Sequence, residues 1–462
     1  MAVLEKNQLH SAVIEDYTSE GLGVCRIDGR AVFVRGAVRG DRCVIRVLKA
    51  PGGRGAVWAN IERVEEPSPH RERGGASCAV FPACGGCDCR HMSYDEELYF
   101  KRRHAEQTLA RIGGVTLTAE EILPAPRDAY RNKALIPVAA DAAGRAVTGF
   151  YRARSNTVAP FQSCPAAMPQ INACAAALRE WIDRNGVPIY DAASGSGLIR
   201  RLFVRVTRNG ASVLAMPVLN GRLPRRHVQT LIDTMRAHCP EITGILTLEN
   251  KRRDNVMLGD GPVTVLWGSE TQTETLGRFE FELHPLAFAQ VCARQAEKLY
   301  DRAAGYAALR SHETAADLYC GVGTLTLWLA ASCERATGAE VSPRAVECAR
   351  RNALRNGITN ADFVCADIGH PPAPVAEAAR LVSGRVDVCT ADPPRAGMDA
   401  AAVDTIARLS PARLVYISCD PGTLARDVRR LAAHGYKAER LTLADMFPGT
   451  RHVECCLMLR RV

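Results

Sequence analysis

The sequence lacks the segments that would place a protein in a membrane or direct it out of the cell. Its 462 residues contain no apolar run that approaches the about 20 residues needed to span a bilayer. Residues 1–19 are polar and of mixed charge, which is not the pattern of a secretory signal peptide. We therefore expect a cytoplasmic protein with no membrane partner, and we expect it to be monomeric.

The chain also lacks the setting in which cysteines form a disulfide framework. It has 18 cysteines and no visible secretion signal. In a reducing compartment, clustered cysteines more often bind metal or do chemistry. Scattered ones, such as Cys43, Cys239 and Cys348, are expected to be small buried apolar residues.

Bulk composition favours a soluble protein with an anionic partner. Hydrophobic residues make up 47% of the chain and charged residues 24%, as in ordinary globular proteins. The formal net charge is +9, which favours nucleic acid as a partner. Most basic residues are Arg, which suits bidentate phosphate contacts. Codon bias in a GC-rich genome explains the preference for Arg over Lys equally well.

The first two regions of the chain differ in pattern. Residues 1–65 contain short strand-like runs separated by turns, which predicts a small OB-like β-barrel, a fold that often binds RNA. A linker rich in Pro and Gly follows. Residues 76–284 mix strand and helix patterns and predict a central α+β domain. Its amphipathic helix over residues 94–112 is a candidate to pack on the C-terminal domain.

Residues 285–462 alternate between strand and helix patterns, which predicts a doubly wound, Rossmann-like α/β domain. The expected strands cover residues 313–317, 335–340, 361–365, 386–391 and 413–418, with a last pair at 438–444 and 453–460. Such sheets bind ligands beyond the carboxyl ends of their strands. Residues that follow the strands are therefore the candidates for chemistry.

The loop after the first of these strands has the form of a cofactor-binding turn. Residues 317–324 read DLYCGVGT, and Gly321 and Gly323 let a ligand approach the backbone closely. The loop lacks the third glycine of a dinucleotide site, so it suits a cofactor without a pyrophosphate, notably S-adenosylmethionine. Glu340 ends the second strand about 20 residues later, the position for gripping ribose hydroxyls. Asp367, after the third strand, is a candidate contact for the base.

The fourth strand leads into the sequence Asp392-Pro393-Pro394-Arg395. The Asp392 carboxylate lies at the edge of the sheet where such folds place their chemistry. Methyltransferases that modify amino groups have a related motif, but with an aromatic residue after the prolines that stacks on the base. Arg395 takes that place here, and the missing aromatic side chain argues against N-methylation.

A cysteine, Cys419, lies where the fifth strand stops and a helix-starting segment begins. A helix N-terminus favours thiolate over thiol, so we expect Cys419 to be a nucleophile beside the cofactor. This arrangement suits C5 of uracil, which becomes nucleophilic when a thiolate adds to C6. A base must then remove the C5 proton. Glu454, at the start of the last strand, is the candidate, and His452 is its rival.

A compact cysteine group predicts a metal centre in the central region. Cys78, Cys84 and Cys87 supply three thiolates, and Cys89 and Cys164 compete for the fourth position. Cys164 precedes a proline, a common setting in iron–sulfur ligation, and two glycines between the thiolates leave room for a bulky cluster. An iron–sulfur cluster is therefore expected. Zinc is the alternative, because four thiolates suit it as well.

Together these motifs resemble the RNA 5-methyluridine methyltransferases of the RumA/TrmA family over nearly the whole chain. The resemblance implies that the N-terminal barrel is a TRAM domain that binds RNA, and that the central domain holds a four-iron four-sulfur cluster. The residues it assigns are the nucleophile Cys419, the base Glu454, the cofactor contacts Gln290, Tyr319, Thr324, Glu340, Asp367 and Asp392, and the cluster ligands Cys78, Cys84, Cys87 and Cys164.

The resemblance favours Cys164 over Cys89 as the fourth ligand. It also implies that residues 130–133, which read YRNK, form a basic segment near the RNA. One departure is visible. The family pattern Phe-Phe-Gln-x-Asn reads FAQVC here, so Gln290 is kept while Cys292 replaces the Asn and its hydrogen bond.

These residues predict an S-adenosylmethionine-dependent 23S rRNA (uracil-C5)-methyltransferase, with a target uridine that flips out of its stack. The barrel and the cluster together favour rRNA, because tRNA enzymes of the TrmA type resemble only the catalytic half. The same chemistry on tRNA is the first alternative. A non-catalytic iron–sulfur RNA-binding protein with a vestigial methyltransferase fold is the second, and the presence of both Cys419 and Glu454 argues against it.

Overall fold

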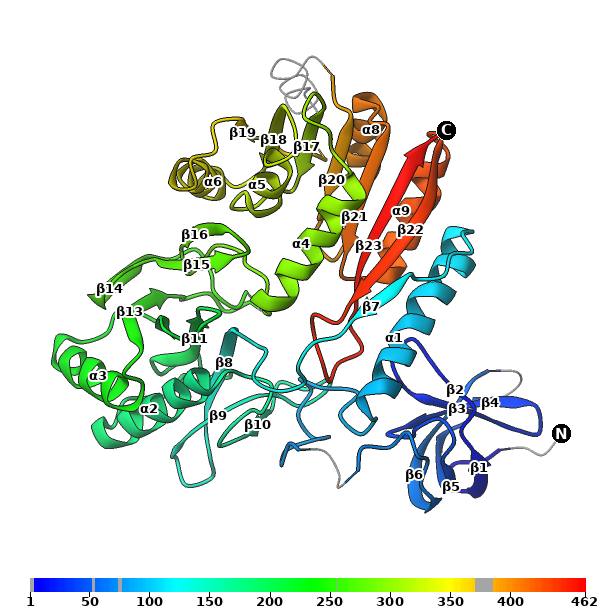
Figure 1. Cartoon of the computed structure of the whole chain (residues 1–462). Helices are drawn as coiled ribbons and strands as arrows, with labels where there is room; N and C mark the ends of the chain where they lie inside the picture. Colours follow the sequence, from blue (N-terminus) through cyan, green and yellow to red (C-terminus); the bar gives the residue numbers. More distant parts are fainter. Residues whose placement is uncertain (1–3, 52–54, 74–76, 255, 370–384) are drawn as a thin grey trace.

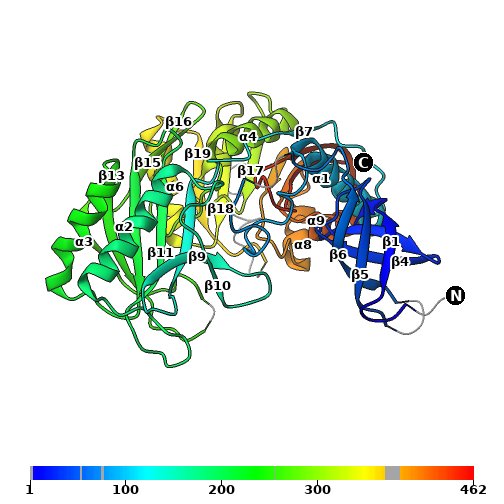
Figure 2. The ribbon, with the colours of Figure 1, turned by 90° about the horizontal axis from the view of Figure 1, so that it is seen from below.

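The computed structural model describes residues 4–51, 55–73, 77–254, 256–369 and 385–462. The chain forms three regions, each built around its own sheet (Figure 1). The N-terminal and central regions lie at opposite ends of the molecule, as the view from below also shows (Figure 2). Gly74 and Gly75 of the predicted linker lie outside the described residues.

The N-terminal region is a six-stranded sheet with its own hydrophobic core. Its strands are β1 (Leu9–Val13), β2 (Asp16–Tyr17), β3 (Gly23–Ile27), β4 (Arg30–Arg35), β5 (Arg42–Lys49) and β6 (Val57–Glu66), in the order β1-β5-β6-β4-β3-β2. Alternate residues point inward, so Val32, Val34 and Val57 are fully buried. The sheet curls back on itself, because Glu15 after β1 donates its N–H to the Val24 carbonyl in β3 (2.8 Å).

The central region is a seven-stranded sheet with two helices on one face. Its strands are β8 (Lys133–Ala140), β9 (Ala146–Tyr151), β10 (Val158–Pro160), β11 (Ile199–Val206), β12 (Val213–Leu219), β13 (Ile242–Glu249) and β14 (Val263–Gly268), in the order β10-β9-β8-β11-β12-β13-β14. The helices α2 (Pro169–Asn185) and α3 (Arg225–His238) bury Trp181 and Leu231 against this sheet. A hairpin of β15 (Gln272–Leu276) and β16 (Phe279–Leu283) leads to the last region.

The C-terminal region is an eight-stranded sheet in the order β19-β18-β17-β20-β21-β23-β22-β7. Its main strands are β17 (Thr314–Leu318), β18 (Arg335–Glu340), β19 (Ala361–Cys365), β20 (Val388–Ala391), β21 (Arg413–Ser418), β22 (Tyr436–Ala444) and β23 (Glu454–Arg461). Helices α4 (Ala293–Ala307), α5 (Thr324–Ala330) and α6 (Pro343–Arg355) cover one face, and α8 (Ala400–Leu409) and α9 (Pro421–Ala432) the other. The strand order reverses between β17 and β20, which is where such sheets bind ligands.

A segment from the predicted central domain completes this sheet. β7 (Glu121–Leu123) pairs in parallel with the edge strand β22. The helix α1 (Tyr94–Thr108), continued by a π-helical turn at Leu109–Gly113, buries Leu109 in the same core as Leu424 of α9. The helix expected over residues 94–112 thus packs on the C-terminal region, and α1 lies between that region and the N-terminal sheet (Figures 1 and 2).

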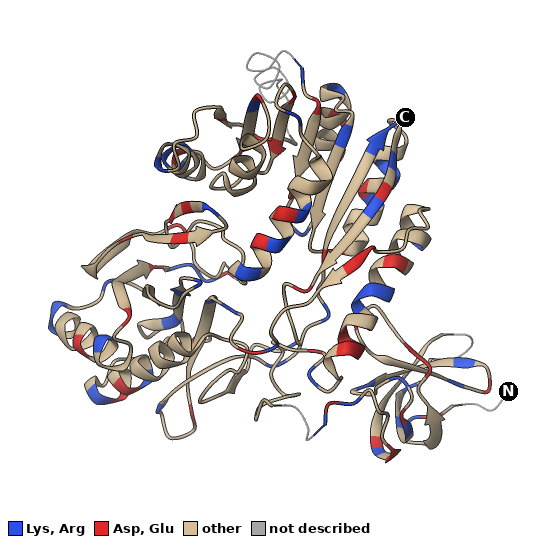
Figure 3. Ribbon diagram, viewed as in Figure 1, with Lys and Arg blue, Asp and Glu red and all other residues tan. Residues whose placement is uncertain are grey.

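Charged residues of both signs are spread over the whole molecule (Figure 3). Lys and Arg occur on elements of all three regions, interspersed with Asp and Glu (Figure 3). In the described part of the chain, no helix is both long and apolar enough to cross a membrane.

Candidate active site

The loop between β17 and α5 has the tight backbone of a ligand-binding turn. Tyr319, Gly321 and Gly323 have φ angles of 65°, 56° and 84°. Glycine adopts such angles readily, whereas Tyr319 holds a strained conformation that its surroundings must maintain. A Cβ atom added to Gly323 would lie 2.9 Å from the Phe363 ring. The loop therefore presents bare backbone at the point where the strand order reverses.

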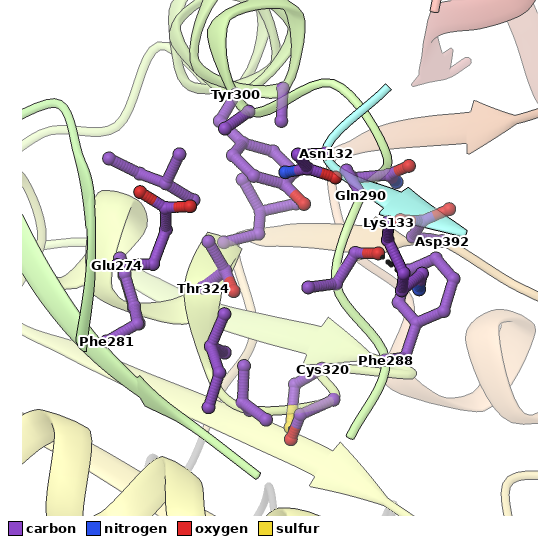
Figure 4. Close-up of a pocket in the computed structure, with 18 of the residues that line it drawn as sticks. Asn132, Lys133, Glu274, Phe281, Phe288, Gln290, Tyr300, Cys320, Thr324 and Asp392 are labelled. Atoms are coloured by element: carbon purple, nitrogen blue, oxygen red, sulfur yellow. Dashed lines mark hydrogen bonds between the residues drawn. The ribbon is translucent and has the colours of Figure 1, made fainter. Parts of the chain in front are cut away.

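A pocket opens at this point of the sheet, with about 790 Å³ of empty space that is partly open to solvent. Four of the predicted cofactor residues line it: Gln290, Tyr319, Thr324 and Asp392. Figure 4 shows Lys133, Phe288 and Asp392 close together on one side of the pocket, with Glu274 and Tyr300 on the other. The pocket thus combines apolar rings with a few convergent polar groups, as small-molecule sites commonly do.

The remaining two predicted cofactor residues follow the neighbouring strands. Glu340, the last residue of β18, accepts hydrogen bonds from the N–H groups of Gly321 (3.2 Å) and Ser342 (2.9 Å). It therefore holds the glycine loop in place. Asp367 lies just beyond β19 and accepts the Gly369 N–H at 3.0 Å.

Two carboxyl groups lie at the base of the pocket. Asp317 is 1% exposed and accepts hydrogen bonds from the hydroxyls of Thr326 and Thr390, both at 2.6 Å. Burial raises the pKa of Asp317 to about 6. Burial, together with the charge of Asp317, raises the pKa of Asp392 to about 7. A positively charged ligand would relieve this accumulation of negative charge.

The pairing of β21 with β23 aligns the two predicted catalytic residues. The antiparallel register joins Ser418 to Cys455. One step further along both strands sets Cys419 opposite Glu454. Residues opposed in this way have Cβ atoms about 5 Å apart. On its other side Glu454 pairs with Ala444 of β22, which fixes the start of β23.

The thiol of Cys419 is less acidic than its place before a helix led us to expect. Burial raises the pKa of the Cys419 thiol to about 11, and the charges of Glu454 and Asp392 act in the same direction. Arg395 opposes them without outweighing them. The expected preference for thiolate is therefore wrong for the ligand-free protein, and the thiol needs a proton acceptor before it can react.

The helix contributes little to Cys419 because another side chain occupies its N-terminus. Asp420 caps α9, and its carboxylate accepts the N–H groups of Gly422 (2.8 Å) and Thr423 (2.9 Å). These are the groups through which a helix end would stabilise a thiolate. Their pairing with a carboxylate leaves burial, together with the surrounding acids, to determine the direction of the pKa shift of Cys419.

The two candidate bases, Glu454 and His452, differ both in position and in protonation. Glu454 is 3% exposed, and burial raises its pKa to about 8, with Asp392 acting in the same direction. Burial and the charges of Arg395 and Arg451 lower the pKa of His452 to about 4. Near neutral pH His452 is therefore neutral and able to accept a proton, whereas Glu454 is mostly protonated and accepts one only in its ionised fraction. The strand register, however, directs Glu454 and not His452 toward Cys419.

The predicted cluster ligands come together around a second pocket, with about 590 Å³ of empty space. All four line it: Cys78, Cys84, Cys87 and Cys164. Cys89 is fully buried in a separate apolar group with Met92 and Phe100, so the fold brings Cys164 and not Cys89 to the other three. Within the described residues, no group of three or more His, Cys, Asp or Glu side chains is arranged to hold a single metal ion.

Comparisons with known proteins place the chain in a family. A family model described as tRNA (Uracil-5-)-methyltransferase matches residues 276–462. An uncharacterized RNA methyltransferase of Halalkalibacterium halodurans is 35% identical over 461 residues, which cover 99% of this chain and 98% of the relative. The chain belongs to the RNA uracil-5 methyltransferase family. A second uncharacterized RNA methyltransferase, from Clostridium tetani, is 32% identical over 99% of this chain and 97% of its own length.

A solved structure of this family matches nearly the whole chain. Pyrococcus abyssi tRNA (uracil-54, C5)-methyltransferase, in complex with S-adenosyl-L-homocysteine, has 26% sequence identity and a TM-score of 0.75. The match covers 97% of this chain and 99% of that one. The methyltransferase fold predicted for the C-terminal region is thereby confirmed.

Several residues of the pocket were not predicted as site residues from the sequence. The Lys133 ammonium group donates to the Ala289 carbonyl (2.9 Å), and its Nζ lies 5.1 Å from the centroid of the Phe288 ring. Burial, with Arg205 and Arg131 in support, lowers the pKa of Lys133 to about 7. The YRNK sequence singled out this segment, but as part of an RNA surface. Its position on the pocket depends on β8, which only the central sheet places there.

The departure at Cys292 has a structural consequence. Cys292 occupies the N-cap of α4, where the family Asn would be a favourable capping residue. Its side chain makes no capping hydrogen bond and is buried in the core, at 2% exposure. The helix is held by backbone bonds instead, since the Cys292 carbonyl accepts the N–H groups of Gln295 and Ala296. Gln290 keeps its place on the pocket despite this change.

The raised pKa of Glu454 predicts a pH-dependent gain in stability when this residue becomes Gln. A carboxyl group whose pKa is raised by folding binds its proton more tightly in the folded state. Ionising it therefore destabilises the fold increasingly from its unfolded pKa up to about 8, after which the penalty is constant. Glu454→Gln should raise the melting temperature more at pH 9 than at pH 5.

Calorimetry at both pH values measures this difference. Glu66→Gln is the control, because the Glu66 side chain is 74% exposed, and it should change the melting temperature equally at both pH values. A gain for Glu454→Gln that is the same at pH 5 and pH 9 would contradict a buried carboxyl group with a raised pKa.

Proposed function

We propose that the protein transfers a methyl group from S-adenosylmethionine to C5 of a uridine in 23S rRNA, through a covalent bond between Cys419 and C6 of the base. The observation that carries this proposal is the β21–β23 register, which, extended by one residue beyond Ser418 and Cys455, opposes Cys419 to the buried Glu454. The charge of Asp392, which lines the cofactor pocket, acts on both groups. Uracil C5 methylation requires such a pair, because the carbon must first be activated and then lose its proton.

The residues that would hold the cofactor surround the glycine loop. Gln290, Tyr319, Thr324 and Asp392 line the pocket, and Glu340 and Asp367 follow the adjacent strands. When bound, S-adenosylmethionine supplies an electrophilic methyl group on a positively charged sulfonium. The acidic base of the pocket, formed by Asp317 and Asp392, fits that charge. The P. abyssi relative, solved with S-adenosyl-L-homocysteine, supports the same assignment.

The chain's own groups then carry the remaining steps. The Cys419 thiol gives up its proton to the Asp392 carboxylate, whose charge acts on this thiol, and an ionised Glu454 stays unprotonated for the later step. The thiolate adds to C6 of uracil. The electron pair of the C5–C6 double bond moves to C5 and O4, which makes C5 nucleophilic toward the methyl group. Glu454 finally takes the C5 proton, the double bond re-forms, and the thiolate leaves. Its pKa of about 8 suits a group that accepts a proton near neutral pH.

The N-terminal and central regions are proposed to hold the RNA. A curled six-stranded sheet in which the ring centroids of Phe33 and Trp58 lie 5.5 Å apart fits a TRAM-like RNA-binding module. A tRNA substrate is the alternative, and a specific observation favours it. The P. abyssi enzyme, a tRNA methyltransferase, matches 97% of this chain, N-terminal region included. The N-terminal region therefore does not by itself distinguish the two RNAs.

The cysteine pocket is proposed to hold a four-iron four-sulfur cluster. Zinc binds four thiolates at about 2.3 Å, which brings the sulfurs together around one ion. The cysteines here line a partly open pocket together with apolar side chains and form no single-ion site within the described residues. A larger group fits this arrangement better. The cluster would be bound by Cys78, Cys84, Cys87 and Cys164 and would order the central region, since methyl transfer needs no electron.

Substitution of the two proposed catalytic residues should separate the steps of the reaction. Cys419→Ala should abolish methylation, because no thiolate remains to activate C5. Glu454→Gln should form the Cys419–uracil bond but release it very slowly, so that an RNA–protein adduct accumulates on denaturing gels. Cys455→Ala is the control, since this neighbouring cysteine takes no part in the scheme. Undiminished turnover by Cys419→Ala would rule out the covalent mechanism.

The RNA substrate can be identified by mapping 5-methyluridine in total RNA from cells with and without the gene. Loss of one or more 23S rRNA sites, with tRNA unchanged, is the expected result. Loss confined to tRNA would assign the alternative substrate. Unchanged 5-methyluridine in both RNAs, together with RNA binding by the purified protein, would favour the non-catalytic RNA-binding reading.

The cluster can be tested without measuring activity. Protein purified without oxygen should be brown, absorb at roughly 400 nm, and contain iron and sulfide. Cys84→Ala should lose the absorbance and most of the iron, whereas Cys89→Ala should retain both, because Cys89 lies in a separate apolar group. Stoichiometric zinc in place of iron would identify the alternative metal.

A further inference from the structure

The proposed base Glu454 follows a loop that is held from two sides. This base loop, residues 445–453, connects β22 to β23 and ends where Glu454 begins the strand. Three consecutive carbonyl groups in it, those of Phe447, Pro448 and Gly449, accept hydrogen bonds from side chains or from distant backbone. These hydrogen bonds restrict the conformation of the loop, because moving it would leave buried carbonyl groups unpaired.

On one side the base loop is bound to α1 by a buried ion triad. Lys101 donates to Glu97 and to Asp445, both at 2.7 Å, and all three side chains are fully buried. Lys101 also donates to the Phe447 carbonyl (3.2 Å), and Glu97 accepts the Gly449 N–H (2.6 Å). Because any displacement of the loop would leave a buried charge unpaired, the triad opposes movement strongly.

A tyrosine adds to this side of the base loop. The Tyr94 hydroxyl donates to the Asp445 carboxylate at 2.9 Å and accepts the Ala125 N–H at 2.8 Å. Tyr94 is the first residue of α1. The loop is thus tied both to that helix and to the segment that follows β7.

On the other side the base loop is bound to the cysteine segment. The Gly449 carbonyl accepts the N–H groups of Asp88 and Cys89, both at 2.9 Å. The Tyr130 hydroxyl, on the wall of the cysteine pocket, donates to the Pro448 carbonyl at 3.0 Å. Gly449 has a φ of 82°, and a Cβ atom there would lie 3.6 Å from the Cys87 sulfur. The cysteine pocket and the base loop are therefore in direct contact.

We propose that Tyr94 and Tyr130 are positioning residues for Glu454, acting through the base loop, and that the cysteine segment thereby controls the proton-removal step. The inference rests on the proposed function, in which Glu454 takes the C5 proton. In this proposal the cysteine pocket contributes to the reaction only by positioning the base loop. The pocket need not touch the uridine, because its contacts with Pro448 and Gly449 determine where the strand that carries Glu454 begins.

This role predicts a defect in one step only. Formation of the Cys419–uracil bond precedes proton removal and does not use Glu454. A loosened base loop should therefore leave adduct formation intact, slow the release of methylated RNA, and let the adduct accumulate. General destabilisation would instead reduce adduct formation and release together.

The test uses the full-length protein and unmodified transcripts of 23S rRNA and of tRNA. Tyr130→Phe and Tyr94→Phe each remove one hydroxyl from the loop's contacts without changing the ring. Loss of one such hydrogen bond should slow release about fivefold and raise the adduct fraction correspondingly. Hydrogen exchange without RNA should show faster exchange of the Gly449 amide in both variants.

Tyr436→Phe is the matched control. Tyr436 is also buried, and its hydroxyl also donates to a proline carbonyl, that of Pro411 at 3.1 Å. This contact lies just before the N-terminal end of β21, whereas Cys419 follows the C-terminal end. The control variant should release RNA at the wild-type rate. If wild-type protein methylates a transcript while both loop variants release it at the wild-type rate, the positioning role is wrong. If wild-type protein methylates neither transcript, the proposed function itself fails.

Discussion

The antiparallel pairing of β23 with β21 is the constraint on which the site depends. Five parallel strands bring their carboxyl ends to one edge of the sheet, and this alone would place Cys419 near the cofactor loop. Only the strand that runs the other way can begin at that edge. β23 does so, and its first residue is Glu454. The proposed nucleophile at the end of one strand is thus opposed to the proposed base at the start of the next.

The same geometry gathers acids where little water can screen them. Asp317, Asp392 and Glu454 all have raised pKa values, because burial disfavours their charged forms. In addition, the charge of Asp317 raises the pKa of Asp392, and the charge of Asp392 raises the pKa of Glu454. The Cys419 thiol is shifted in the same direction. Such a site is poised for a cationic ligand, whose charge would favour both carboxylate and thiolate. Proton transfer among these groups can then occur near neutral pH.

Much of the C-terminal region could be predicted from the sequence, because its signals are local. The strands expected at 335–340, 361–365 and 413–418 agree with β18, β19 and β21 to the residue. Strand β6 is less clear from local pattern, since its sequence VWANIERVEE exposes charged residues on one face and reads poorly as a strand. The acidity of Cys419 was misjudged for a related reason: the helix start was visible in the sequence, whereas the carboxylates that oppose it come from other strands.

The sequence by itself determined the chemistry that is available: a glycine turn without a third glycine, an Asp-Pro-Pro-Arg corner, a cysteine at a strand end, and the close group of Cys78, Cys84 and Cys87. Each of these is a property of a few adjacent residues. Only the tertiary structure decided how they are combined. Lys101 meets Asp445 across 344 residues, and Tyr130 meets Pro448 across 318. Contacts of that range depend on how whole sheets and helices pack, which no local pattern records.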